Sequence, residues 1–158
     1  MTSVRLTPLS RGGFEEYIAS EIREYAVSHV RDGRWSESEA LERSEREVRG
    51  LIPQGLETPN HYFFRIENDH GNDVGRVWLA RRNEEGVPYA FVYDLVIFPD
   101  HRRQGYGEAA MLELESIARG LEVPRVALHV FGDNANAIRL YEKLGYATTN
   151  RMMSKPLE

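Results

Sequence analysis

The chain has 158 residues, of which 41% are hydrophobic and 10% aromatic, and this favours one domain with a core over residues 1–158. A formal charge of -5, from 20 Lys and Arg against 25 Asp and Glu, argues against a general nucleic-acid binder and is compatible with a cationic substrate. The lack of cysteine excludes disulfides, thiolate metal sites and a cysteine nucleophile, and without a secretion signal or a membrane-spanning run we expect a soluble, cytoplasmic protein.

The first sixty residues predict a short strand, two helices and a loop. Val4 to Leu6 read as the strand, and a first amphipathic helix follows that Gly33 ends. The residues that recur at helical spacing are Phe14, Ile18, Ile22, Tyr25 and His29 or Val30. Ser36 can cap a second helix, whose charged face we interpret as solvated. The two prolines and the glycine of residues 51–60 predict a loop.

Three strands follow this loop. His61 to Glu67 and Val74 to Arg81 are rich in aromatic and branched residues, and the turn formers between them predict a hairpin. A third strand covers Tyr89 to Phe98. Strands so close in sequence are expected to be antiparallel.

The remaining chain predicts a helix from Gly107 to Arg119, a strand from Arg125 to Phe131, a helix from Asn134 to Leu144 and a last strand from Tyr146 to Ser154. A helix between two strands implies a parallel crossover. We therefore predict the α+β class, with a mixed, mostly antiparallel sheet flanked by helices and one parallel strand pair joined by a helix.

An anion site is predicted where the third strand runs into the next helix. Gly105 and Gly107 lack a Cβ, so they permit left-handed backbone angles and a close approach of a bulky anion to the main chain. The start of the helix adds free N–H groups and the positive end of its dipole. Arg102 and Arg103 add cationic side chains, so we expect a phosphate group here.

A second helix start is expected at the same edge of the sheet. Ligands of open sheets bind beyond the carboxyl ends of parallel strands, and the turn of residues 131–134 lies at such an end. An elongated anionic ligand could place its phosphates on the first helix start and an uncharged arm along the strands toward the second.

These two segments, DLVIFPDHRRQGYG and LHVFGDNANAIRLYEKLGY, resemble the GNAT family of N-acetyltransferases. The family signature Arg/Gln-x-x-Gly-x-Gly/Ala falls on Arg102, Gly105 and Gly107. Its Asn-x-x-Ala-x-x-Leu-Tyr segment falls on Asn134, Ala137, Leu140 and Tyr141. The resemblance covers about the carboxy-terminal half of the chain. Residues 61–158 would form the sheet and cofactor core, and residues 1–60 would lie on the acceptor side.

The resemblance implies acetyl-coenzyme A as co-substrate, no metal, and a small-molecule or peptide amine as acceptor. It implies neither nucleic acid nor membrane as partner and leaves a homodimer open. By this resemblance the cofactor is bound by three groups of residues. They are Val96, Ile97 and Phe98 along the pantetheine arm; Arg102, Arg103, Gln104, Gly105, Tyr106, Gly107 and Glu108 around the pyrophosphate; and Asn134, Ala137 and Tyr141 of the second segment.

Acyl transfer to an amine requires a neutral nucleophile, a polarised carbonyl and a proton for the departing thiolate. An amine with a pKa of about 10.4 is almost entirely charged at neutral pH, a deficit of roughly 4 to 5 kcal/mol, so a base or a water relay must help. His129 is the first candidate base, and Asp94 could instead orient a water or hold the cationic acceptor. The N–H near Ile97 can stabilise the oxyanion, and Tyr141 can protonate the sulfur.

Other interpretations of these residues stay open. His129 could be a satisfied core histidine, Asp94 could pair with an arginine, Tyr141 could pack on an apolar stripe, and Asn134 could be only a helix cap. The alternative function is a non-catalytic domain that binds an acyl-coenzyme A as a sensor or docking module. A nucleoside triphosphatase is disfavoured because the Gly-Lys-Ser/Thr ending of a P-loop is missing. The identity of the amine is not encoded in any motif that we recognise.

Overall fold

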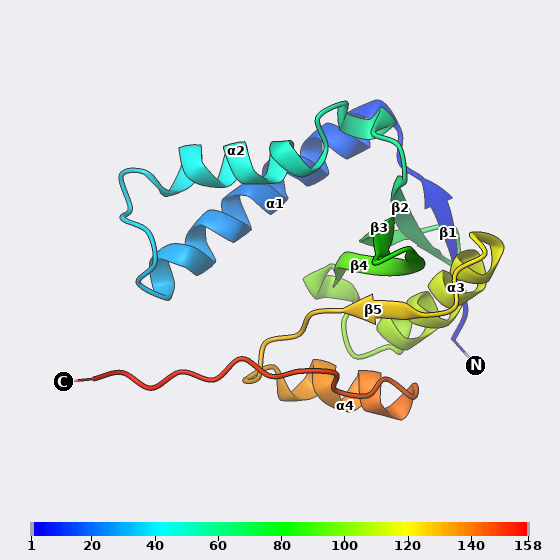
Figure 1. Cartoon of the computed structure of the whole chain (residues 1–158). Helices are drawn as coiled ribbons and strands as arrows, with labels where there is room; N and C mark the ends of the chain where they lie inside the picture. Colours follow the sequence, from blue (N-terminus) through cyan, green and yellow to red (C-terminus); the bar gives the residue numbers. More distant parts are fainter. Residues whose placement is uncertain (1, 158) are drawn as a thin grey trace. The chain divides into compact units, whose positions relative to one another are not determined.

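The computed structural model describes residues 2–157 and divides them into two units, residues 2–128 and residues 129–157. Figure 1 shows the elements in chain order. The first unit contains β1 (Val4–Pro8), α1 (Arg11–Arg31), α2 (Ala40–Leu51), the short 3-10 turn η1 (Gly55–Glu57), β2 (His61–Asn68), β3 (Asp73–Glu84), β4 (Val87–Ile97), the 3-10 turn η2 (Pro99–His101), α3 (Tyr106–Gly120) and β5 (Val126–Leu128). The second unit contains α4 (Ala135–Lys143).

The strands of the first unit form one five-stranded sheet in the order β1-β2-β3-β4-β5. Neighbours from β1 to β4 are antiparallel, whereas β4 and β5 are parallel and are connected through α3. The predicted mixed α+β sheet with one parallel pair is therefore confirmed. No helix within residues 2–157 is long and apolar enough to cross a membrane.

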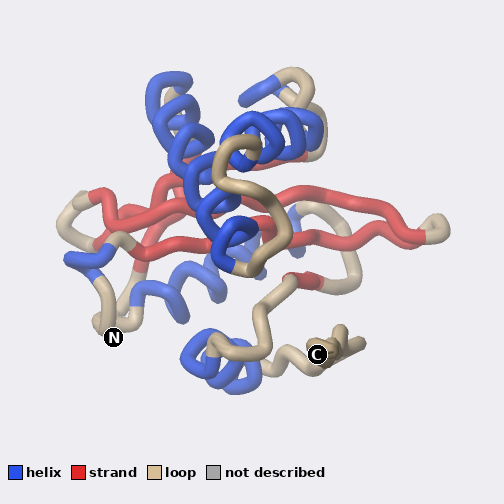
Figure 2. The backbone as a smooth tube through the Cα atoms, turned by 90° about the vertical axis from the view of Figure 1, so that its left-hand side faces the viewer, coloured by secondary structure: helices blue, strands red, loops and turns tan. Residues whose placement is uncertain are grey.

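The helices α1 and α2 cover one face of this sheet, and α3 lies on the other (Figure 2). Alternate strand residues point to opposite faces, so Phe63 and Trp78 face α1 while their neighbours Phe64 and Val77 face α3. The core on the α1 side consists of Leu9, Phe14, Tyr17, Ile18, Ile22, Val48, Ile52, Phe63 and Trp78. On the other side, α3 buries Ala110, Met111, Leu114 and Ala118.

The hairpin between β3 and β4 extends further than the sequence pattern predicts. Asn83 pairs with Pro88 and Glu84 with Val87, so that only two residues form the turn. Both have positive φ, 51° for Glu85 and 85° for Gly86, as two-residue turns of this handedness require. The side chain of Asn83 supports the turn by accepting a hydrogen bond from the Gly86 N–H at 2.8 Å.

Three predicted details are wrong. Ser36 does not cap the second helix through its side chain; instead its carbonyl oxygen accepts from the Ala40 N–H at 3.1 Å, and Glu39 occupies the N-cap position. The last strand, predicted over residues 146–154, is absent, and β5 ends at Leu128 rather than at Phe131. A strand needs a neighbour for its ladder of hydrogen bonds, and the described part of the second unit contains no strand to supply one.

Candidate functional site

β4 bends at Tyr93, on the α1 side of the sheet. Asp94 lies opposite Trp78 and Val92 opposite Leu79, so Tyr93 is an extra residue that forms a bulge. Over the part of the chain described, β4 pairs with β5 only from residue 90 to residue 92. Beyond the bulge, β4 is therefore paired with β3 alone among the strands of the first unit, so its other main-chain edge is free of strand pairing there.

Gly75 allows the end of β4 to approach β3 closely. A Cβ at this position would lie 2.1 Å from the carbonyl oxygen of Val96 and 3.2 Å from the Cα of Ile97. The Phe98 N–H continues the contact by donating to the Val74 carbonyl at 2.9 Å. The absence of a side chain at Gly75 thus fixes the path of residues 96–98, the stretch predicted to lie along the pantetheine arm.

The turn after β4 leads directly into α3. Gly105 is the N-cap residue, with a left-handed φ of 83° and no side chain to satisfy the first N–H groups of the helix. Arg103 also has a positive φ of 64°, which orients the main chain of the turn. A helix of 15 residues adds the positive end of its dipole. These features are compatible with the anion site, which stays a prediction.

Side chains from other elements hold this turn in place. The Thr2 hydroxyl donates to the Gln104 carbonyl at 3.0 Å, and the Asn68 amide donates to the Tyr106 hydroxyl at 3.1 Å. Arg102 uses its Nε–H for the Ile97 carbonyl at 2.9 Å. Arg102 therefore joins the end of β4 to the turn, in addition to placing a positive charge beside it.

We expect Gly105→Ala to weaken binding of coenzyme A more than it destabilises the fold. An alanine in the left-handed conformation costs roughly 1 to 2 kcal/mol, and relief of that strain would move the N–H groups of the turn. Gly71→Ala is the matched control, because Gly71 has a φ of 80° but no atom lies within 4 Å of a Cβ added there. Calorimetry should give a raised Kd for the first variant alone, and equal Kd values would contradict the anion site.

A polar cluster lies beside the bulge, between α1 and β4. The Tyr17 hydroxyl donates to Asp94 Oδ2 at 2.7 Å, and Glu21 lies near enough for Asp94 to act on its pKa. Tyr17 is buried, whereas both carboxyl side chains are half-buried and so remain partly accessible. Tyr17 and Glu21 are four residues apart and therefore project from the same face of α1.

The carboxyl pKa values in this cluster are raised because both acids lie in a partly buried environment. Burial, with the negative charge of Asp94 and the hydrogen bond to it, raises the pKa of Glu21 from 4.5 to about 9. Burial also raises the pKa of Asp94, although hydrogen bonds from Glu21, Tyr17 and the Leu95 N–H act in the opposite direction. Burial therefore disfavours the ionised form of both acids.

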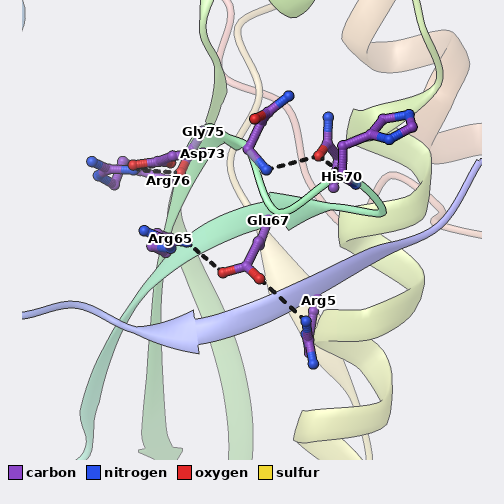
Figure 3. Close-up of polar contacts among 9 residues, drawn as sticks. Arg5, Arg65, Glu67, His70, Asp73, Gly75 and Arg76 are labelled. Atoms are coloured by element: carbon purple, nitrogen blue, oxygen red, sulfur yellow. Dashed lines mark hydrogen bonds and ion pairs between the residues drawn. The ribbon is translucent and has the colours of Figure 1, made fainter.

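A hollow of about 380 Å³ lies at the corner between β1 and α1. Figure 3 shows Glu67 between Arg5 and Arg65, at 3.2 and 2.5 Å, and Arg76 beside Asp73, at 2.6 Å. Both carboxylates are thus neutralised by arginines. The hollow lies apart from the turn before α3 in the sequence and is lined by none of its residues.

The second unit contains the other predicted residues. Asn134 caps α4, its side chain accepting from the Ala137 N–H at 3.3 Å, so its interpretation as an N-cap is confirmed. The ring of Tyr141 lies 5.8 Å from that of Tyr146, edge to face. His129 is exposed, and its ring lies 5.1 Å from that of Phe131.

The predicted residues thus fall into two groups. Val96 to Glu108 form one continuous stretch of the first unit, and Asp94 lies in the polar cluster two residues before it. The second unit contains the other predicted residues, His129, Asn134, Ala137 and Tyr141. That they form one site with the first group stays a prediction. Sequence reasoning missed Tyr17 and Glu21. Their common face on a predicted helix was a usable signal, but nothing indicated that it meets Asp94. Within residues 2–157, no group of three or more metal-ligating side chains is present.

A bulged strand with one free edge, followed at once by a glycine-capped helix start, characterises proteins that bind an elongated, phosphate-bearing ligand. The chain belongs to the Acetyltransferase (GNAT) family, whose model matches residues 22–146, and it is an acetyltransferase. This family uses acetyl-coenzyme A as co-substrate.

Relatives match over nearly the whole chain. YdgE of Bacillus subtilis, named an uncharacterized N-acetyltransferase, is 36% identical over 152 residues, which cover 96% of this chain and 97% of YdgE. YycN of the same organism, also named an uncharacterized N-acetyltransferase, is 32% identical over 155 residues, 98% of this chain and 99% of its own length. The crystal structure of YycN has a TM-score of 0.90 to this structure, covering 99% of each chain. An acetyl transferase structure from Pyrococcus furiosus is 26% identical, with a TM-score of 0.71, and covers 99% of this chain and 100% of its own.

Proposed function

We propose that this protein transfers the acetyl group of acetyl-coenzyme A to a primary amine by direct attack of the amine on the thioester. The observation that carries the proposal is the free edge of β4 beyond Tyr93, continuous with the glycine-capped start of α3. An extended arm along the edge and a diphosphate at the helix start match the two ends of coenzyme A. The family match runs from residue 22 to residue 146, which supports a single acetyltransferase domain that includes both units.

In this proposal the main chain of Val96, Ile97 and Phe98 binds the pantetheine arm. Residues 102–108 surround the pyrophosphate, with N–H groups from the turn and the charges of Arg102 and Arg103. Asn134, Ala137 and Tyr141 complete the site by the resemblance of their segment to the family motif. The N–H of Ile97 stabilises the oxyanion that forms when the amine attacks.

Two proton transfers accompany the reaction. The amine must lose a proton before it attacks, and either His129 or Asp94 takes this role in the proposal. The departing thiolate must gain a proton, which the Tyr141 hydroxyl supplies. Asp94 is favoured as the group that meets the cationic acceptor, because it lies in a cluster with raised carboxyl pKa values and is partly accessible.

The test is release of free thiol from acetyl-coenzyme A in the presence of single amines. We expect thiol release with at least one of spermidine, Nα-acetyl-lysine, tetraalanine and kanamycin, which sample a polyamine, a lysine side chain, a peptide amino terminus and a drug-like amine. Mass spectrometry of the product should show one added acetyl group on nitrogen. Tight binding of acetyl-coenzyme A in calorimetry without thiol release for any amine would instead support the non-catalytic sensor.

A further inference from the structure

An aromatic row, formed by Tyr89, Phe91 and Tyr93, follows β4 away from the bulge on the α1 side of the sheet. Tyr93 packs against the core of that side, and the ring centroid of Phe91 lies 4.8 Å from that of Tyr93. The ring of Tyr89 lies 6.5 Å from that of Phe91. Phe91 and Tyr93 are partly accessible, so the aromatic row continues the surface beside Asp94 toward the β3–β4 turn.

Arg82 of β3 places its guanidinium over all three rings of the aromatic row. Its Cζ lies 4.9 Å from the ring centroid of Phe91, 5.7 Å from that of Tyr89 and 5.8 Å from that of Tyr93. A cation is attracted to the face of an aromatic ring, because the ring face is the negative part of its quadrupole. The three rings therefore restrict the position of the guanidinium without neutralising its charge.

The charge of Arg82 is not paired with an acid. Within residues 2–157 its exposed side chain forms no ion pair and no hydrogen bond. Arg125 differs in this respect: it lies over Tyr89 at 4.3 Å, but its guanidinium is also paired with Glu84 at 3.0 Å. The N–H donors of Arg82 are therefore left to bind an anion from outside the protein, and their planar arrangement matches the two oxygens of a carboxylate.

We propose that Arg82 is a specificity-determining residue that binds a carboxylate of the acceptor. This inference rests on the proposed function and specifies its acceptor as an amine that also carries a carboxylate. The reacting amine lies beside Asp94, and the carboxylate lies at the far side of the aromatic row, on Arg82. Polyamines and aminoglycosides, which lack a carboxylate, are then poor acceptors.

The register of β3 and β4 limits the distance between the two ends of such an acceptor. Arg82 is four residues from Trp78, the pairing partner of Asp94, and this corresponds to roughly 13 Å along a strand. The guanidinium lies about as near to Tyr93 as to Tyr89, so it extends toward the bulge and shortens the span. A lysine with a free α-carboxylate and a short peptide fit this span. The α-amine of a single amino acid does not, because its carboxylate is bonded to the carbon that bears the nitrogen.

The test compares two acceptors with their carboxamides, which lack the negative charge and are otherwise alike. The pairs are Nα-acetyl-lysine with Nα-acetyl-lysinamide, and tetraalanine with tetraalanine amide. For at least one pair, kcat/KM of the acid should exceed that of the amide roughly 10- to 100-fold, the effect of one hydrogen-bonded contact between charged groups. The difference should lie mainly in KM, because the contact is present in the ground state as well as in the transition state.

Variants of Arg82 should change this acid-to-amide ratio. In Arg82→Gln the ratio should fall close to one, and in Arg82→Lys it should be intermediate, because lysine keeps the charge but not the planar set of donors. Arg125→Gln is the matched control: it removes a cation over the same row whose charge Glu84 already pairs, and it should keep the wild-type ratio. Calorimetry should give the wild-type Kd for acetyl-coenzyme A in all three variants, which excludes a general loss of structure.

The outcomes separate this inference from the proposed function. If the wild-type protein uses acid and amide equally, or acetylates only amines without a carboxylate such as spermidine, the inference fails alone. A wild-type ratio in Arg82→Gln would also overturn it, because the carboxylate would then be bound elsewhere. If the wild-type protein releases no thiol with any amine, the proposed function fails and the inference fails with it.

Discussion

Replacement of Tyr141 by phenylalanine is expected to lower kcat by at least 10²-fold while the Kd for acetyl-coenzyme A stays within a factor of about two. The substitution removes only the hydroxyl that, in the proposed mechanism, protonates the departing thiolate. The aromatic ring and its edge-to-face contact with Tyr146 are retained. A 10²-fold loss corresponds to about 2.7 kcal/mol of transition-state stabilisation. Stopped-flow thiol detection and calorimetry on the same preparations measure the two quantities.

Tyr146→Phe is the matched control, because it removes the hydroxyl of the other ring in that contact. We expect this variant to turn over close to the wild-type rate. If Tyr141→Phe kept the wild-type kcat, the proton would have to come from another group. If it lost cofactor binding in proportion to turnover, the role of Tyr141 would be structural.

Gly75→Ala is expected to reduce the free energy of unfolding by roughly 3 kcal/mol. The new methyl group would lie 2.1 Å from the Val96 carbonyl oxygen, so the backbone of β4 would have to move away from β3. The displaced residues 96–98 are those proposed to bind the pantetheine arm, and the Kd for acetyl-coenzyme A should rise as well. Urea unfolding followed by circular dichroism gives the first quantity, and calorimetry gives the second.

Gly50→Ala serves as the control for this substitution. Gly50 lies in the last turn of α2, its φ is not positive, and no atom lies within 4 Å of an added Cβ. Alanine should stabilise this position by about 0.5 to 1 kcal/mol, because glycine loses more backbone entropy on folding. Similar free energies of unfolding for Gly75→Ala and Gly50→Ala would show that the backbone of β4 moves away from β3 at little cost in free energy. They would contradict the close approach of the two strands.

The parts of the site that depend on local sequence could be predicted. The sequence predicts that Gly105 permits left-handed backbone angles, and its φ is left-handed at the start of α3. Asn134 caps α4 because cap geometry involves only the next three residues. The antiparallel strands and the parallel crossover also followed from short-range patterns, because neighbouring strands in the sequence are neighbours in the sheet.

Features that depend on distant partners could not be predicted. The alternation of residues 146–154 resembles a strand, but no pattern states whether a neighbour is present, and the segment carries no strand in the structure. Glu21 reads as one of many acidic residues on a helix, and its pKa is raised only when folding buries it beside Asp94. The role of Gly75 could not be recognised from the sequence either. A side chain is excluded there by the Val96 carbonyl, which belongs to a strand later in the chain.

Trp78 can serve as an intrinsic fluorescence probe in this enzyme. Its indole N–H donates to Nδ1 of His61 at 3.0 Å, and its ring stacks on Tyr93, the bulge residue adjoining Asp94, with the ring centroids 4.7 Å apart. Burial and the charge of Arg82 lower the pKa of His61, so its imidazole remains a neutral acceptor. Trp35, the only other tryptophan of the chain, lies in a separate core cluster with Ala26 and Ala40. A Trp35→Phe background would therefore isolate fluorescence from the bulge and allow acceptor binding to be followed in real time without a label.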